Sequence, residues 1–106
     1  MPDMTGWTLP EDAREKIGES NAGALERYIA HRIRTGDFLY AVLTNDLFGA
    51  FGRADYNNRN RIYEIVSVIC EHLPAISFGD PQTVSDWLSK KDIDREKELA
   101  ENHPNV

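Results

Sequence analysis

The sequence has almost none of the features that attach a small protein to a membrane or cross-link it through disulfides. One of its 106 residues, Cys70, is a cysteine, and no apolar run approaches the roughly 20 residues that cross a bilayer. The first four residues lack the basic start and apolar stretch of a signal peptide. We therefore expect a cytoplasmic protein with no membrane partner, in which Cys70 is a small buried filler.

An excess of either charge is also missing from the middle of the chain. The net charge is −6, but residues 1–20 and residues 92–106 each sum to −3, while residues 21–91 hold eight acids and eight bases. A nucleic-acid binder usually presents a basic face, and a protein that imitates DNA needs dense carboxylates on its folded surface. The neutral body disfavours both classes, because the acidity belongs to the two ends of the chain.

Apolar residues recur at spacings of three and four, which predicts helices and no strands. Helices are expected over residues 21–34, 38–51 and 58–72, preceded by a short one that ends at Ile17 and followed by one that begins at Asp80. The fold class is therefore all-α, a compact bundle of four to five helices with short loops. Residues 1–20 form an N-terminal arm with a short helix, held weakly through Trp7 and Leu9. Residues 21–91 form the helical core domain, and residues 92–106 form an acidic C-terminal tail.

The predicted core follows these helical stripes. The second helix buries Ala22, Leu25, Ile29 and Ile33, with Tyr28 and Arg32 at the edge of the stripe. The third is the most apolar and central, through Phe38, Leu39, Val42, Leu43, Leu47, Ala50 and Phe51. The fourth buries Ile62, Ile65, Val66, Ile69 and Leu73, and Pro74 ends it. Ile76 and Phe78 are expected to plug the core, and Val84, Trp87 and Leu88 form an apolar face on the last helix.

Three residues in or near the end of the third predicted helix need a tertiary explanation. Gly49 and Gly52 lower its helix propensity, which indicates close approach of another helix. Asp46 interrupts its apolar face, so we expect this carboxylate to be partly buried and paired, with Arg53 or with an arginine of the fourth helix. A structural tie between helices is favoured over a binding or catalytic role for Asp46.

No pattern in the chain indicates catalysis or a metal. The nucleophile elbow, HExxH, CxxC, P-loop and GxGxxG patterns are all missing. The histidines are spread over two predicted helices and the tail: His31, His72 and His103. The nearest approach to a ligand set is Asp46, Asp55 and Glu64, which no ligand spacing supports. We expect a protein that is not an enzyme and has no catalytic residues, cofactor or metal.

The densest cationic feature of the neutral body is the polar patch at residues 52–61. Its candidate binding residues are Arg53, Asp55, Tyr56, Asn58, Arg59 and Arg61. Arginine with tyrosine and asparagine suits the recognition of carboxylates, phosphates or a nucleobase. The alternative is a solvated turn in which Asp55 or Asn57 caps the next helix, and this alternative is favoured.

Several short motifs occur together at fixed spacing. They are Thr35-Gly36-Asp37-Phe38-Leu39-Tyr40-Ala41-Val42-Leu43-Thr44-Asn45-Asp46-Leu47, then Ala54-Asp55 with Asn57 or Asn58, then Pro74 and Gly79 before Trp87-Leu88. Over residues 22–90 the chain resembles a widespread family of small bacteriophage and prophage proteins with no assigned activity. The resemblance implies a phage context, in which small proteins commonly bind a host RNA polymerase subunit, nuclease or defence complex. It implies no functional residues.

Three hypotheses follow. The leading one is a phage accessory protein that binds a host or phage protein through the polar patch, for host takeover or as an anti-defence inhibitor of the anti-CRISPR type. The alternative is a small nucleic-acid or nucleotide-binding module that uses the arginines from Arg53 to Arg61. The third is a homo-oligomer formed through Tyr40, Phe48 and Phe51.

Overall fold

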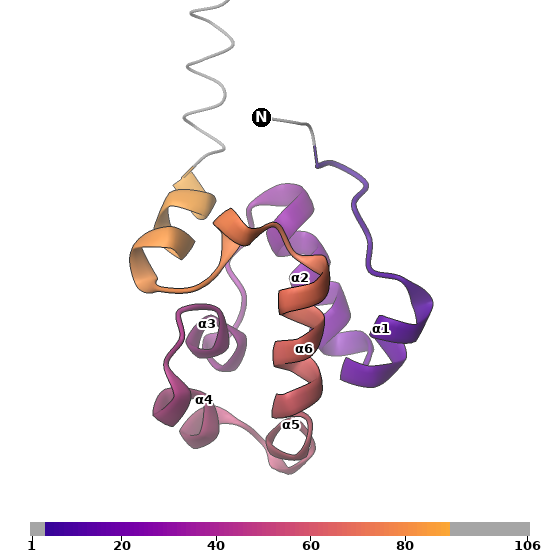
Figure 1. Cartoon of the computed structure of the whole chain (residues 1–106), viewed down its shortest axis with the longest axis vertical. Coiled ribbons are helices and arrows are strands. Elements are labelled where there is room, and N and C mark those ends of the chain that lie inside the picture. The colour runs from indigo at the N-terminus through magenta and orange to yellow at the C-terminus, as the bar shows by residue number, and fades with distance from the viewer. Residues whose placement is uncertain (1–3, 90–106) are drawn as a thin grey trace, which may run out of the picture.

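The computed structural model describes residues 4–89 and confirms an all-α fold (Figure 1). Its helices are α1 (Glu11–Ile17), α2 (Glu19–His31), α3 (Asp37–Leu43), α4 (Leu47–Arg53), α5 (Tyr56–Asn60) and α6 (Ile62–His72). The 3-10 turn η1 (Ala75–Ser77) and a helix over residues 81–89 follow. The described chain has more helices than the predicted four to five, because two of the predicted helices are each divided in two.

The first division falls at residues 44–46, within the third predicted helix. The Thr44 hydroxyl bonds back to the Tyr40 carbonyl at 2.8 Å, and Asn45 adopts a left-handed φ of 65°, which asparagine tolerates better than most residues. Asp46 then caps α4 by accepting a hydrogen bond from the Gly49 N–H at 2.9 Å. Asp46 is exposed, so the prediction of a partly buried carboxylate was wrong.

The second division falls at Arg61. Asp55 caps α5 by accepting from the Asn58 N–H at 2.7 Å, which is the capping role that the sequence allowed for it. Arg61 leaves the helical conformation with φ −108° and ψ 4°, and α6 begins at the next residue. The patch at residues 52–61 therefore consists largely of the end of α4 and the whole of α5. It is mostly helical, whereas the alternative hypothesis described it as a solvated turn.

The core forms where α2 meets the helix over residues 81–89. Trp87 is 1% exposed, and its indole N–H donates to the Tyr28 carbonyl at 3.0 Å. The Tyr28 ring is fully buried, and its hydroxyl donates to the Ser77 carbonyl at 2.7 Å. Burial raises the pKa of Tyr28, so this hydroxyl remains a neutral donor. Tyr28 is a central core residue, although the sequence placed it at the edge of a stripe.

The N-terminal segment belongs to this core. Helix α1 packs against both α2 and α6 (Figure 1), and Leu9, Ala13 and Ile17 are all buried. The sequence predicted only weak attachment through Trp7 and Leu9, because α1 has few apolar residues. Its two buried positions are four residues apart and therefore lie on one face of the helix. The predicted acidic tail, residues 92–106, lies outside the described residues.

Several side chains expected in the core are exposed. Ile33 is 49% exposed because α2 ends at His31, and Arg32 turns the chain with a left-handed φ of 57°. Ile76 is 48% exposed, and the neighbouring Ser77 is the buried residue of η1, while Phe78 packs partly against the core as predicted. Cys70 is exposed on α6, so the prediction of a buried thiol was wrong.

The two glycines of α4 do not meet another helix of residues 4–89. A Cβ atom built on Gly49 would lie 2.1 Å from the Asp46 carboxylate, and one built on Gly52 would have nothing within 4 Å. The predicted close approach is therefore absent within the described chain. At Gly49 the neighbours are the capping Asp46 side chain and the Arg53 guanidinium of the same helix, and at Gly52 there is open space.

Glu26 gives the fold a pH dependence. Its carboxylate is 16% exposed and accepts hydrogen bonds from the Arg14 guanidinium and from the Leu9 N–H. Burial raises the pKa of Glu26, but the two hydrogen bonds and the charges of Arg14 and Arg27 outweigh it and hold the pKa below its ordinary value. A carboxyl group with a depressed folded pKa contributes stability above its unfolded pKa and loses it as the pH falls.

We therefore expect the thermal midpoint to fall as the pH drops below the ordinary value of 4.5, and Glu26→Gln to flatten this part of the profile. The variant should also have a lower midpoint at neutral pH, because the two donors lose their charged acceptor. Circular dichroism melts across the acidic range measure both effects. Glu15→Gln, at an exposed position of α1, is the matched control. Identical acid profiles for the two variants would contradict the assignment.

Candidate functional site

The six residues predicted to bind a partner divide into two sets that the fold separates. One set, Asp55, Asn58 and Arg61, faces the turn between α1 and α2. The other, Arg53, Tyr56 and Arg59, stands outward at the junction of α4 and α5. The sequence could not distinguish the sets, because the members of each recur every three residues and only the packing of α5 and Arg61 on the α1–α2 turn decides which set faces inward.

The inward set holds α5 and α6 onto the α1–α2 turn. The Asn58 side-chain oxygen accepts from the Asn21 amide at 2.8 Å. The Arg61 guanidinium donates to the Ile17 carbonyl at 3.3 Å and covers Gly18, where a Cβ atom would lie 2.5 Å from it. These contacts satisfy the end of α1 and the start of α2, so the inward set is structural.

A polar cleft lies beside the inward set. It has a volume of about 390 Å³ and is lined by Ile17, Gly18, Glu19, Ser20, Asn21, Asp55, Asn57, Asn58 and Arg61. Two carboxylates line it along with one guanidinium, so the cleft lacks the net positive charge that an anionic ligand would need. Because Asn21, Asn58 and Arg61 are engaged in contacts within the protein, the cleft offers few free donors.

The outward set, which we call the cationic edge, has little contact with the rest of the chain. Tyr56 is 81% exposed. Arg53 and Arg59 donate to the carbonyls of Gly49 and Phe51, each at 3.4 Å, and within residues 4–89 neither arginine forms an ion pair. Both guanidinium groups therefore keep most of their hydrogen-bonding capacity for another molecule.

A second group of exposed side chains, which the sequence assigned largely to the core, lies on α4 and α6. We call it the apolar face, and it comprises Leu47 (59% exposed), Phe48 (90%), Phe51 (41%), Tyr63 (80%), Val66 (42%) and the half-buried Ile62. The homo-oligomer hypothesis named Phe48 and Phe51 correctly as exposed residues. Its third member, Tyr40, is half-buried and lies under the Arg34 guanidinium, 4.1 Å from the ring centroid.

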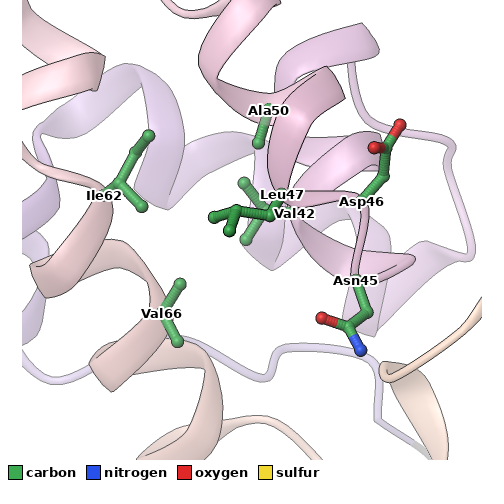
Figure 2. Close-up of a pocket in the computed structure, with 7 residues that line it drawn as sticks. All are labelled: Val42, Asn45, Asp46, Leu47, Ala50, Ile62 and Val66. Atoms are coloured by element: carbon green, nitrogen blue, oxygen red, sulfur yellow. The ribbon is translucent and has the colours of Figure 1, made fainter.

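A groove runs through the apolar face between α4 and α6. Its volume is about 60 Å³, and it is lined by Val42, Asn45, Asp46, Leu47, Ala50, Ile62 and Val66. Figure 2 shows Ile62 and Val66 on one side, Val42, Leu47 and Ala50 on the other, and the two polar residues beyond Leu47. Sequence reasoning missed the groove because it read residues 38–51 as one helix. The break at residues 44–46 frees α4 to turn Leu47 and Phe48 away from the core.

The described residues bring together no catalytic set. No group of three His, Cys, Asp or Glu side chains in residues 4–89 is placed to hold a metal ion. Asp46 and Asp55 cap separate helices, His72 lies 3.8 Å from Glu71, and His103 falls outside the described residues. Among the helices of residues 4–89, none combines the length and the apolarity that a bilayer crossing requires.

Comparisons of the chain with protein-family models, with curated proteins and with solved structures found no match. The resemblance to small phage proteins therefore stays a prediction, and arguments about function depend on the chemistry of the surface.

Proposed function

We propose that this protein is a small phage accessory protein that acts in the host cytoplasm without catalysis, by binding a host or phage protein. The observation that carries the proposal is the cationic edge: two arginines without an ionic partner in residues 4–89 and one tyrosine that is 81% exposed, all at the junction of α4 and α5. Host takeover or inhibition of a defence complex is the corresponding biological role.

The composition of the edge supports a protein partner. Arginine and tyrosine are enriched among the residues that dominate binding energy in protein interfaces. A guanidinium group recognises a carboxylate through two parallel hydrogen bonds, so the partner surface should present acidic side chains opposite Arg53 and Arg59. The net charge of −6 opposes long-range attraction to an acidic partner, so the two arginines would act at short range.

Fewer arginines are available to support the nucleic-acid alternative. Arg61 is committed to the Ile17 carbonyl at 3.3 Å, which leaves two outward arginines in the patch. Each phosphate that a protein neutralises adds to the salt dependence of binding, so two arginines support only a weak interaction.

A double variant, Arg53→Ala with Arg59→Ala, tests the proposal. We expect it to lose partner capture from host lysate, measured by affinity purification with quantitative mass spectrometry, and to keep its thermal midpoint because both side chains are exposed. Arg61→Ala should do the reverse: it should lower the midpoint by roughly 4–8 °C, since a lost hydrogen bond is worth about 1 kcal/mol, and retain capture.

Arg27→Ala, at an exposed position of α2, is the matched control for removing an arginine. Capture of the same proteins by the double variant and by the wild type would contradict the proposal. Binding of DNA, RNA or nucleotides that weakens steeply with salt, and that the double variant loses, would replace it with the nucleic-acid alternative.

A further inference from the structure

A polar pocket lies between α3 and α4 and includes Arg53 of the cationic edge. Its volume is about 210 Å³, and the charged and aromatic residues that line it are Arg34, Asp37, Tyr40, Asp46 and Arg53. Small-molecule sites usually measure about 300–1,000 Å³, so this pocket is small for a free ligand. It has room for one side chain of another protein, and its chemistry decides which kind.

Arg34, in the segment that leads into α3, is held at the pocket by its neighbours. Its guanidinium lies over the Tyr40 ring, 4.1 Å from the centroid. Its Nη1 donates to the Asp37 carboxylate and to the Thr35 carbonyl, each at 3.4 Å. The cation–π contact restricts the side chain, so Arg34 loses less conformational freedom when it binds another molecule.

Arg53 reaches the same pocket because of Gly49. Its Nη1 donates to the Gly49 carbonyl at 3.4 Å, so the side chain extends back along α4. A Cβ atom on Gly49 would lie 2.8 Å from this nitrogen and 2.1 Å from Oδ2 of Asp46. The glycine lowers helix propensity, but its missing side chain gives both charged groups their space.

The hydrogen bonds that both arginines make within residues 4–89 come from Nη1 alone. Their Nε–H and Nη2 donors stay available, and these donors form the fork that binds a carboxylate through two parallel hydrogen bonds. The two carboxylates of the pocket are already engaged: Asp37 accepts from Arg34, and Asp46 accepts from the Gly49 N–H at 2.9 Å. The pocket therefore suits a group that accepts hydrogen bonds, either a carboxylate or a phosphate.

The charge of the pocket distinguishes between these two anions. Asp37 and Asp46 balance Arg34 and Arg53, so the lining is formally neutral. A phosphate monoester carries about −1.5 to −2 charges, and it loses more hydration energy than a carboxylate on entering a pocket that has no net positive charge to offset the loss. A neutral pocket with fork-shaped donors therefore favours the carboxylate.

We propose that this pocket receives the carboxylate of one Asp or Glu side chain of the partner, and that Arg34 and Arg53 hold it together. The inference rests on the proposed function, because Arg53 belongs to both the pocket and the cationic edge. It adds Arg34 to the binding surface. It also states what the partner must present: an acidic side chain that projects far enough to enter a recess.

The first test is the binding of a short peptide to the purified chain. The peptide acetyl-Gly-Glu-Gly-amide is added at low salt, where ion pairs are least screened, and the arginine Nε–Hε signals are followed by NMR. The signals of Arg34 and Arg53 should shift saturably, with a dissociation constant on the order of 1 mM. The signal of Arg27, which is exposed on α2, should stay in place.

The control peptides carry Gln or Lys in place of Glu and should shift neither Arg34 nor Arg53. The proposal would be overturned by a response to either control peptide or by equal shifts at Arg27. It would also be overturned by no response of the two pocket arginines at about ten times the expected dissociation constant.

The second test uses variants of the pocket. Arg34→Ala should weaken the Glu peptide by about tenfold or more and keep the fold, because the side chain is 52% exposed. Gly49→Ala should also weaken it, since the added Cβ displaces the Arg53 guanidinium. Gly52→Ala is the matched control, because its Cβ meets nothing within 4 Å on the same helix. Wild-type affinity in Arg34→Ala, or equal affinities in the two glycine variants, would contradict the proposal.

The experiments separate this inference from the proposed function. If the Arg53→Ala, Arg59→Ala double variant loses partner capture and Arg34→Ala keeps it, the pocket is not part of the contact and the proposed function stands. If the Glu peptide binds as expected but the double variant still captures the partner, the proposed function fails and the pocket remains a carboxylate site.

Discussion

Trp87→Ala should destabilise the protein by about 3–5 kcal/mol, the largest effect that we expect from a single substitution. The ring is 1% exposed, lies 6.3 Å from the Tyr28 ring and has the Arg32 guanidinium 3.4 Å from its centroid. Its removal leaves a cavity in the core and takes away one of the two hydrogen bonds that the Tyr28 carbonyl accepts, the other coming from the Arg32 N–H at 3.2 Å. Thermal unfolding followed by circular dichroism should show a midpoint lowered by more than about 12 °C.

Trp87→Phe separates the two contributions. Phenylalanine keeps much of the ring volume and loses the hydrogen bond to the Tyr28 carbonyl, so we expect a smaller loss, of about 1–3 kcal/mol. Trp7→Ala is the control for removing an indole, because Trp7 is half-buried at the edge of the core. Equal midpoints for Trp87→Ala and Trp7→Ala would show that the helix over residues 81–89 does not close the core.

Ile17→Ala should cost about 2–5 kcal/mol, because the side chain is fully buried at the end of α1. Helix α1 packs against both α2 and α6, so we expect the entire protein to unfold at a lower temperature, in one transition. Denaturant unfolding followed by far-ultraviolet circular dichroism measures the loss of free energy. Intrinsic tryptophan fluorescence, followed in parallel, shows whether the core unfolds together with the helices.

The matched control is Ile33→Ala. It removes the same atoms from a residue that is 49% exposed, where substitutions usually change stability by less than about 0.5 kcal/mol. If Ile17→Ala were as mild as Ile33→Ala, or if α1 melted in a separate early transition, residues 1–20 would be the weakly held arm that the sequence predicted.

Helix α4 carries one residue of the cationic edge, Arg53, and three exposed apolar residues, Leu47, Phe48 and Phe51. Asp46 caps its start and Arg53 ends it. Leu47 borders the groove, and Phe48 projects from the outward side. A seven-residue helix with a single buried residue, Ala50, presents most of its surface to other molecules.

Local chemistry in the sequence determined the fold class and several helix ends. Asp80 accepts from the Thr83 N–H at 2.7 Å and starts the last helix as predicted, and the hydrogen bonds that Asp80 receives hold the pKa of its carboxyl below the ordinary value. Val84 and Trp87 are buried as their spacing indicated. Capping and helical periodicity act over three or four residues, so they can be read without knowledge of distant contacts.

Only the tertiary structure decided which apolar residues are buried and which patch residues are free. Val66 follows a helical stripe, yet it borders a groove because no element of residues 4–89 lies over that side of α6. Arg61 and Arg59 are two residues apart in the sequence, yet one bonds to the Ile17 carbonyl and the other stands outward. Burial and pairing depend on how helices pack over long separations in sequence, and periodicity within one helix carries no information about the helix that will lie against it.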